Sequence, residues 1–353
     1  MSSVSVNSWA QSGLFTQLVS DNAATKAQFD TLTEQSASGK VADTYGGLGT
    51  SARVSLSLRP QMSEITTWQQ NVTAAGTTLD TTQSVLKQLQ TIASDFSSDA
   101  LGTDMEAANG AQALATQATQ ALQQVVTLLN TAADGQYTFA GTDSANPPIS
   151  TTDLASFSTT VASQVAGLST GTDPTTLVSD LLTSGTTASF AYPGSATSGT
   201  TPSALLTTVG TGHAVTTAFV AGVNSFATQT GSSTTGSYVR DIVTALAGLA
   251  GLSTTTASQI DLQSFGSGIS QILQNASTAI ETEEAGFGEV QSELTTRGTD
   301  LSDLQTSLTK QVSSVEDADM TATATALSEV QTQLQASYKI ISTAASMSLV
   351  TYL

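Results

Sequence analysis

Apolar residues recur every seven positions over 62–96, and a second row follows three positions later in each heptad. Two such rows over about five heptads are typical of a helix that packs in a coiled coil. Pro60 stands just before the segment, where a missing backbone N–H costs a helix least. The pattern therefore predicts one long helix that begins after Pro60. The two rows are Ile65, Val72, Leu79, Leu86 and Ala93, and Trp68, Ala75, Thr82, Leu89 and Phe96.

The same periodicity predicts further helices toward both ends of the chain. Small apolar residues form the rows of about 103–133, so another helix can approach closely there. The longest apolar row runs through 266–319, although Glu283, Arg297 and Gln311 interrupt its companion row. A helix with few charges is predicted over 322–349, and another over 14–38.

The middle of the chain, 143–265, has a different composition. It is rich in Ser, Thr and Gly and holds five of the six prolines. Such punctuation is typical of short strands and turns. Two short apolar stretches, 177–182 and 239–249, are compatible with short helices. We therefore predict a separate mixed or β-containing domain here.

These patterns predict a mainly α protein with an inserted α+β or β domain. The helical part is expected to be an elongated rod of long antiparallel coiled-coil helices formed by both termini. The expected domains are an N-terminal assembly helix and connector (1–60), the N-terminal half of the rod (61–142), a Ser/Thr/Gly-rich outer domain (143–265), the C-terminal half of the rod (266–319) and a C-terminal assembly helix (320–353).

Composition excludes several classes of partner. Charged residues make up only 10% of the chain, against roughly 25% in typical soluble domains, so much of the surface is expected to face protein. The net charge is −19 and the basic residues are scattered, which disfavours binding to nucleic acid or an anionic membrane. No apolar run approaches the ~20 residues of a membrane span, and the first ten residues do not resemble a cleavable signal peptide.

Candidate catalytic chemistry is sparse. The chain has no cysteine and one histidine, His213, in a Gly-Thr-Gly-His turn, which we interpret as a surface residue. The acidic groups Glu283–Glu284 and Glu316, Asp317 and Asp319 lie on predicted helices with no facing cleft, so solvated or interface roles are expected. Asp317 and Asp319 also precede the last helix, where carboxylates cap exposed N–H groups. We therefore predict no catalytic residue, no cofactor and no metal site, and a protein that is not an enzyme.

Both ends of the chain resemble the flagellin family. At the C-terminus the similar motifs are Val315-Glu-Asp-Ala-Asp-Met320, Ala326-Leu-Ser328, Gln333-Leu-Gln-Ala-Ser-Tyr338 and Ser348-Leu-Val-Thr-Tyr-Leu353. At the N-terminus they are Leu32-Thr-Glu-Gln-Ser-Ala-Ser-Gly-Lys40, Arg53 and Leu58-Arg59. The usual acidic, proline-bearing turn after Ser-Gly is replaced by Tyr45-Gly-Gly-Leu-Gly49, which we interpret as a flexible helix–helix connection.

One further motif bears on the place within that family. Gly135-Gln-Tyr-Thr-Phe-Ala-Gly-Thr142 resembles most the hook–filament junction protein, hook-associated protein 3, in which such a motif leads into the outer domain. Filament flagellins share both ends, so a filament subunit remains an alternative. A surface adhesin or glycan-binding module displayed by 143–265 is a second alternative, and a coiled-coil protein unrelated to flagella is a third.

The resemblance implies a structural, self-assembling subunit that serves motility. It implies type III export with an uncleaved N-terminal signal and an extracellular location in the flagellum. The implied partners are other flagellar subunits, both hook-associated proteins and flagellin, together with further copies of the chain and an export chaperone. It implies neither nucleic-acid binding nor membrane insertion.

Three groups of residues are expected to carry this assembly. Apolar residues of the terminal helices form the predicted assembly interface: Leu14, Leu18, Leu327, Leu334, Ile341, Leu349 and Leu353. The predicted junction between rod and outer domain consists of Tyr137, Phe139 and Gly141. Polar contacts to a neighbouring subunit or an adjacent helix are expected from Arg53, Arg59, Asp317 and Asp319.

Overall fold

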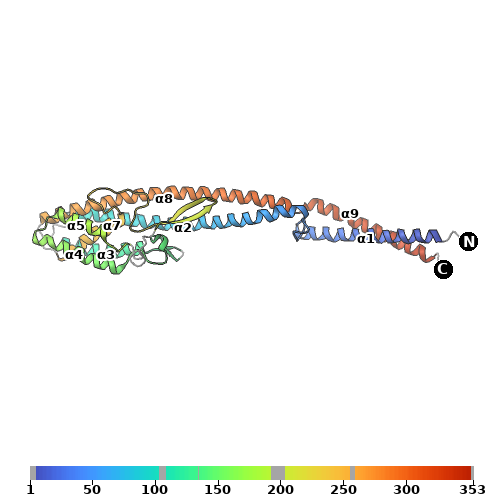
Figure 1. The fold of residues 1–353 in the computed structure, drawn as a ribbon, viewed down its shortest axis with the longest axis horizontal. Coiled ribbons are helices and arrows are strands. Elements are labelled where there is room, and N and C mark those ends of the chain that lie inside the picture. The colour runs from blue at the N-terminus through green and yellow to red at the C-terminus, as the bar shows by residue number, and fades with distance from the viewer. Residues whose placement is uncertain (1–4, 103–108, 134, 192–202, 255–258, 351–353) are drawn as a thin grey trace. The chain divides into compact units, whose positions relative to one another are not determined.

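The protein is mainly α-helical, with long helices and a small β part (Figure 1), as the heptad pattern predicts. The computed structural model describes residues 5–102, 109–133, 135–191, 203–254 and 259–350. The chain divides into two compact units. Unit 1 is formed by Met1–Thr66 and Ser302–Leu353, and unit 2 by Thr67–Leu301.

Unit 1 pairs helices from the two ends of the sequence. Helix α1 (Ser5–Ser38) and helix α9 (Met320–Val350) lie side by side and run in opposite directions (Figure 1). Unit 1 also contains the first turns of α2 (Ala52–Leu101), the short η1 (Gly49–Ser51) and the last turns of α8 (Gln259–Glu316). The predicted helices over 14–38 and 322–349 are therefore present and somewhat longer.

The seam between α1 and α9 follows alternating three- and four-residue steps, as in a coiled coil. Side chains at these positions are buried or half-buried, while most of those between them are exposed. On α1 they are Leu18, Asn22, Thr25, Phe29, Leu32 and Ser36. On α9 they are Thr323, Leu327, Val330, Leu334, Ser337 and Ile341.

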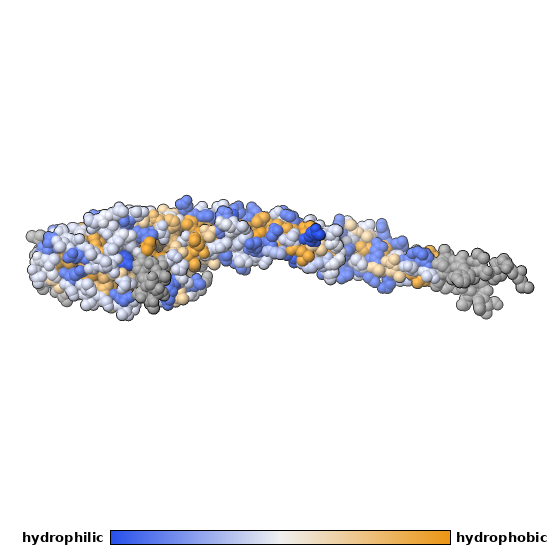
Figure 2. All heavy atoms as spheres, in the orientation of Figure 1, coloured by the Kyte–Doolittle hydropathy of each residue, from blue (hydrophilic) through white to orange (hydrophobic). Residues whose placement is uncertain are grey.

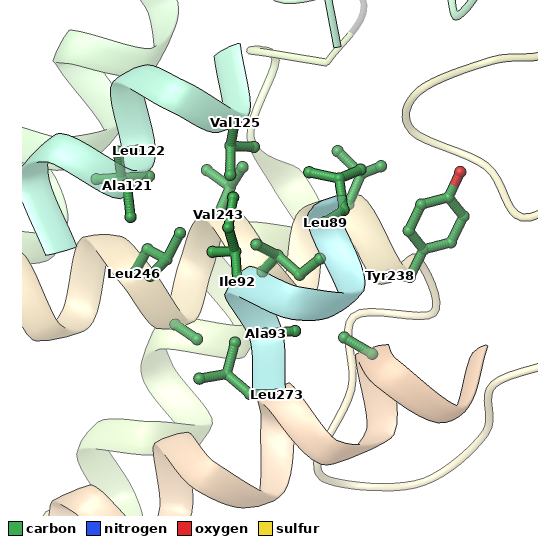
Figure 3. Packing of buried hydrophobic residues seen from close by; sticks show 14 of the residues in the cluster. Leu89, Ile92, Ala93, Ala121, Leu122, Val125, Tyr238, Val243, Leu246 and Leu273 are labelled. Atoms are coloured by element: carbon green, nitrogen blue, oxygen red, sulfur yellow. The ribbon is translucent and has the colours of Figure 1, made fainter. Parts of the chain in front are cut away.

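Unit 2 has the larger core, in which four helices meet. The central part of α2 packs with α3 (Gly110–Leu129), α7 (Tyr238–Gly251) and α8. Figure 3 shows Ile92 of α2 beside Val125 of α3 and Val243 of α7, and Ala93 of α2 near Leu273 of α8. Helix α7 is buried on nearly all sides, which explains why its sequence is apolar almost throughout.

The middle of the chain contains more helix than its composition suggested. Alongside α7 it forms α4 (Thr151–Val165) and α5 (Pro174–Thr187), and a hairpin pairs β3 (Leu205–Gly210) with β4 (His213–Ala218). The predicted short helices lie within α5 and α7, but α4 was predicted as strands and turns. The remaining short elements are β1 (Ala132–Ala133), β2 (Gln136–Tyr137), η3 (Gly141–Asp143), η4 (Ala166–Thr170) and η5 (Leu252–Thr254).

Helix α4 forms because its polar composition hides a helical period. Ser150 caps its start by accepting a hydrogen bond from the backbone N–H of Asp153. Four apolar residues at helical spacing are buried, and the Ser and Thr residues lie mostly on the exposed side. The buried residues are Leu154, Phe157, Val161 and Val165.

The prediction that a helix begins after Pro60 was wrong. Helix α2 begins at Ala52, so Pro60 lies inside it. The ring removes the hydrogen bond that the carbonyl of Leu56 would accept, which disfavours the helix there. The preceding turns remain helical because Ser55 and Leu58 are buried against the rest of unit 1. Tertiary contacts therefore override the local preference.

Candidate assembly site

The predicted assembly residues that the structure describes lie in the α1–α9 seam. Leu334 is buried, with 7% of its surface exposed, and Leu18, Leu327 and Ile341 are half-buried. Helices α1 and α9 include Leu14 and Leu349, but the side chains of these two lie outside the described part, as does Leu353. Within one chain, the seam therefore brings the apolar residues of both ends together.

This seam is thin and partly polar. Asn22, Thr25 and Ser337 occupy seam positions that larger apolar residues fill in a strong coiled coil. The side-chain oxygen of Asn22 is buried and has no hydrogen-bond partner among the described residues. Outside the seam positions of α9, Tyr338 and Ile340 are more than half exposed. The pair of helices thus gains little from its own packing and leaves apolar surface uncovered.

A polar cluster, which we call the Glu316 clamp, closes the end of unit 1 where α8 turns into α9. The carboxylate of Glu316 accepts hydrogen bonds from Nη2 of Arg59 at 2.7 and 2.9 Å, from its Nε at 3.2 Å and from the hydroxyl of Ser55. The backbone oxygen of Glu316 accepts from the N–H of Val41 at 2.8 Å. One residue therefore ties the start of α2 and the α1–α2 connection to the α8–α9 turn.

The backbone beside the clamp is shaped to allow this contact. Gly39 ends α1 with φ +72°, a conformation that favours glycine, and its carbonyl accepts from the N–H of Ala318 at 2.9 Å. Lys40 and Asp317 then form an isolated antiparallel bridge. The N-terminal Ser-Gly-Lys motif and the C-terminal Glu-Asp-Ala-Asp motif, far apart in the sequence, thus meet in unit 1.

The four predicted polar residues have different surroundings. Arg59 pairs with Glu316, and Asp319 caps α9 by accepting from the N–H groups of Thr321 at 2.9 Å and Ala322 at 3.1 Å. The side chains of Asp317 and Arg53 make no hydrogen bond or ion pair in the described part of the chain. Arg53 is exposed.

The clamp predicts a measurable pH dependence. The hydrogen bond from Ser55, followed by that from Arg59, holds the pKa of Glu316 below its usual value of 4.5. The folded state thus binds this proton less readily than the unfolded chain, so stability from the clamp is present above about pH 4.5 and is lost as the pH falls below it. Glu316→Gln is expected to lower the melting temperature of unit 1 by a few degrees at neutral pH and to flatten its acid dependence.

The measurement is thermal unfolding followed by circular dichroism between pH 3 and pH 7. Glu329→Gln is the matched control, because Glu329 is exposed on α9. Equal melting curves for the two variants would show that the clamp contributes nothing to stability.

The predicted junction motif lies in unit 2, where it forms a short strand-like contact. The N–H of Phe219 donates to the carbonyl of Thr138 at 3.1 Å, the N–H of Gly141 to the carbonyl of Phe219 at 2.8 Å, and the N–H of Ala221 to the carbonyl of Phe139 at 2.9 Å. The Phe139 side chain is fully buried, and that of Tyr137 is half-buried.

Gly141 is required at its position for two reasons. Its φ is +56°, which disfavours other residues, and a Cβ there would collide with the carbonyl oxygen of Ser203 and lie 2.8 Å from Cγ2 of Val220. The motif therefore fixes the chain between β2 and α4 against the segment that follows β4.

One important acidic residue was misread from the sequence. Glu283 was predicted to be solvated or at an interface, but only 1% of its surface is exposed. Its Oε1 accepts from the consecutive backbone N–H groups of Ser225, Phe226 and Ala227, each at 2.8 Å. Burial raises the pKa of Glu283, while these donors act in the opposite direction. The carboxylate thus anchors the irregular segment 219–237, which we call the strap.

The strap has further anchors in unit 2. Asp241, which is fully buried, accepts from the N–H of Thr235 and the hydroxyl of Thr234, both at 2.6 Å. Phe226 lies directly on Gly286 of α8, where a Cβ would collide with its ring, and meets Phe287 edge-on at 5.3 Å between centroids. One sequence signal could have revealed the anchor: Glu283 stands between Ala276 and Val290 in a row at heptad spacing, where a buried carboxylate must be hydrogen-bonded.

The described part of the chain offers no constellation for metal chemistry. It contains no group of three or more His, Asp or Glu side chains placed to hold a metal ion. His213 is exposed at the start of β4. Among the same residues, no helix combines the length and the apolar character that crossing a membrane requires.

Comparison with known proteins shows a family to which the C-terminal part is similar. Residues 270–353, which include α9 and most of α8, match the model of the bacterial flagellin C-terminal helical region. This match supports the flagellin family, whose members are structural proteins, and rests on that part of the chain. No curated protein matches the chain at a significant level.

Among solved structures, the chain is similar to one described as a provisionally assigned flagellar hook-associated protein from Vibrio parahaemolyticus. The two are 13% identical, and the similarity covers 78% of this chain and 99% of the other, with a TM-score of 0.48.

Proposed function

We propose that this protein is an exported structural subunit of the bacterial flagellum that assembles through helices from its two ends. The observation that carries the proposal is the flagellin C-terminal match over 270–353, which includes the whole of α9. The proposed function is mechanical, and its proposed location is the extracellular flagellum. The assembly segments are then 1–60 and 320–353, and the proposed partners are other flagellar subunits, further copies of the chain and an export chaperone.

The surface of unit 1 supports a role in assembly. Among the described residues, most large apolar side chains with an exposed surface belong to unit 1, although it is the smaller unit. Figure 2 shows hydrophobic residues reaching the surface over α1 and α9. Apolar side chains left exposed by the fold become buried when such a surface contacts other proteins. These residues are Val19, Val41, Tyr45, Val54, Leu56, Leu304, Met320, Tyr338 and Ile340.

The distribution of charge supports the same role. Unit 1 carries six basic and ten acidic residues, a net charge of −4, whereas unit 2 carries three basic and 18 acidic residues, a net charge of −15. Copies of unit 1 can therefore approach one another with far less electrostatic repulsion than copies of unit 2.

Within the flagellum, we place the subunit at the junction between hook and filament. The support is the Gly135–Thr142 motif, which resembles the junction protein and in which Phe139 is buried and Gly141 is sterically required. A filament subunit remains the second candidate, because the matched family model is that of flagellin itself.

The proposal is tested by genetic complementation. Cells that lack the gene are expected to lose motility and to regain it with the full chain, but not with a chain truncated after residue 319. The protein is expected in the medium only when the flagellar export apparatus is intact. Normal swimming of cells with the truncated chain would contradict the proposal.

Assembly of the purified chain separates the two candidates. A junction subunit is expected to stop at a short layer, whereas a filament subunit is expected to grow into long tubes without other proteins. Electron microscopy of the purified protein makes the distinction, and long tubes would refute the junction assignment while leaving the flagellar one intact.

A further inference from the structure

The first turns of α2 carry an exposed surface in which an apolar residue lies between two guanidinium groups. Arg53, Leu56 and Arg59 follow at three-residue spacing, which rotates each about 60° from the next around the helix, so Leu56 lies in the middle. Leu56 is 52% exposed, and the side chain of Arg59 is 49% exposed. Arginine is enriched among the residues that dominate binding at protein interfaces.

Both guanidinium groups retain donors for an external partner. Arg53 forms no hydrogen bond or ion pair within the described chain. Arg59 uses Nε and Nη2 for Ser55 and Glu316, and its Nη1 forms no hydrogen bond to any described residue. The surface can therefore accept a carboxylate without breaking the Glu316 clamp.

The last turns of α8 present the complementary pattern. Leu304 is 46% exposed, and its neighbour Asp303 is exposed with no hydrogen bond or ion pair in the described part of the molecule. The two surfaces are complementary, because each presents an exposed leucine and the charge beside it is negative on α8 and positive on α2. Both surfaces belong to unit 1, where repulsion between copies is smallest.

We infer that the Arg53–Leu56–Arg59 surface of one copy binds the Asp303–Leu304 surface of a second copy. The inference rests on the proposed function, since it specifies a contact by which the subunits assemble. Charge complementarity selects this occupant: the exposed carboxylate of Asp303 on one copy can face the guanidinium of Arg53 on the next, although each copy has a net charge of −19. Because the two surfaces differ, the contact is heterologous and can continue from copy to copy.

Charge reversal tests the contact in the full-length protein. Arg53→Glu and Asp303→Lys are each expected to weaken self-association about tenfold or more, because each places like charges opposite one another. An equimolar mixture of the two variants is expected to regain wild-type association, since the introduced carboxylate of one variant then faces the introduced ammonium group of the other. The doubly substituted chain is expected to regain it as well. Sedimentation velocity measures all four, with circular dichroism to verify folding.

Lys87→Glu and Asp95→Lys are the matched controls, because both residues are exposed in unit 2 and the changes in charge are identical. Failure of the mixture and of the double variant to regain association would overturn the contact, and so would single variants that associate like the controls. After either of these two outcomes, the proposed function still stands if the wild-type chain assembles and cells that carry it swim normally. If association is unchanged but Arg53→Glu abolishes motility, the surface binds a different subunit and the inference is wrong. A wild-type chain that never self-associates overturns the inference also.

Discussion

Gly141→Ala is expected to lower the free energy of unfolding of unit 2 by about 3 kcal/mol, because it combines two separate costs. A residue with a Cβ at φ +56° costs about 1 kcal/mol or more in backbone strain. The new methyl group would also collide with the carbonyl oxygen of Ser203, and overpacking of this kind costs about 1–3 kcal/mol. The backbone cannot move away easily, because the N–H of Gly141 donates a hydrogen bond to the carbonyl of Phe219.

Gly135 provides the matched control from the same motif. Its φ is +78°, and a Cβ there meets no atom within 4 Å, so Gly135→Ala retains the strain and lacks the collision. Gly135→Ala is therefore expected to lower the free energy of unfolding by about 1 kcal/mol. Urea unfolding monitored by Trp68 fluorescence, in a Trp9→Phe background, reports on unit 2. Equal losses for the two variants would show that the collision is relieved and that the close packing of Gly141 is unimportant.

The long helices could be predicted because their apolar rows extend far beyond the range of chance. The seam residues Leu327, Leu334 and Ile341 keep strict heptad spacing, and the helix that carries them is present. Helix α4 was missed although Leu154, Phe157 and Val161 already stood at helical spacing. Its Ser- and Thr-rich composition was given more weight than its period, and for a half-exposed helix the period is the physical determinant.

The candidate site could be predicted only in part, because ion pairs depend on which helices become neighbours. The sequence indicated a polar contact of Arg59 with an adjacent helix or a neighbouring subunit, but its partner Glu316 is 257 positions away and follows from the packing of α2 against α8. Asp319 could be predicted as a cap because capping is local. Pro60 shows the opposite case, in which the local rule was sound and burial of Ser55 and Leu58 outweighed it.

Glu283→Ala is expected to destabilise unit 2 by about 3 kcal/mol at neutral pH. The change leaves the N–H groups of Ser225, Phe226 and Ala227 without their acceptor, and an unsatisfied buried donor costs about 1–3 kcal/mol. Release of the charge from its buried position offsets part of that cost. Phe226 is expected to leave Gly286, so amide hydrogen exchange should increase within the strap more than in α7, which remains buried.

Glu283→Gln separates the acceptor from the charge. The amide oxygen still accepts from the strap, so the free energy of unfolding of this variant is expected to fall by less than about 1 kcal/mol at neutral pH.

The sign of the pH effect follows from the raised pKa of Glu283: the folded state binds the proton more readily than the unfolded chain. Stability of the wild-type unit should therefore decrease as the pH rises above the usual value of 4.5 and become constant above the raised pKa. Asp241, whose pKa burial also raises, contributes in the same direction and remains in the variant. The difference between wild type and Glu283→Gln in urea unfolding from pH 4 to pH 8 isolates Glu283. The contrary result is a wild-type unit that gains stability relative to the variant as the pH rises over this range. It would show that the three N–H donors lower the pKa of Glu283 more than burial raises it.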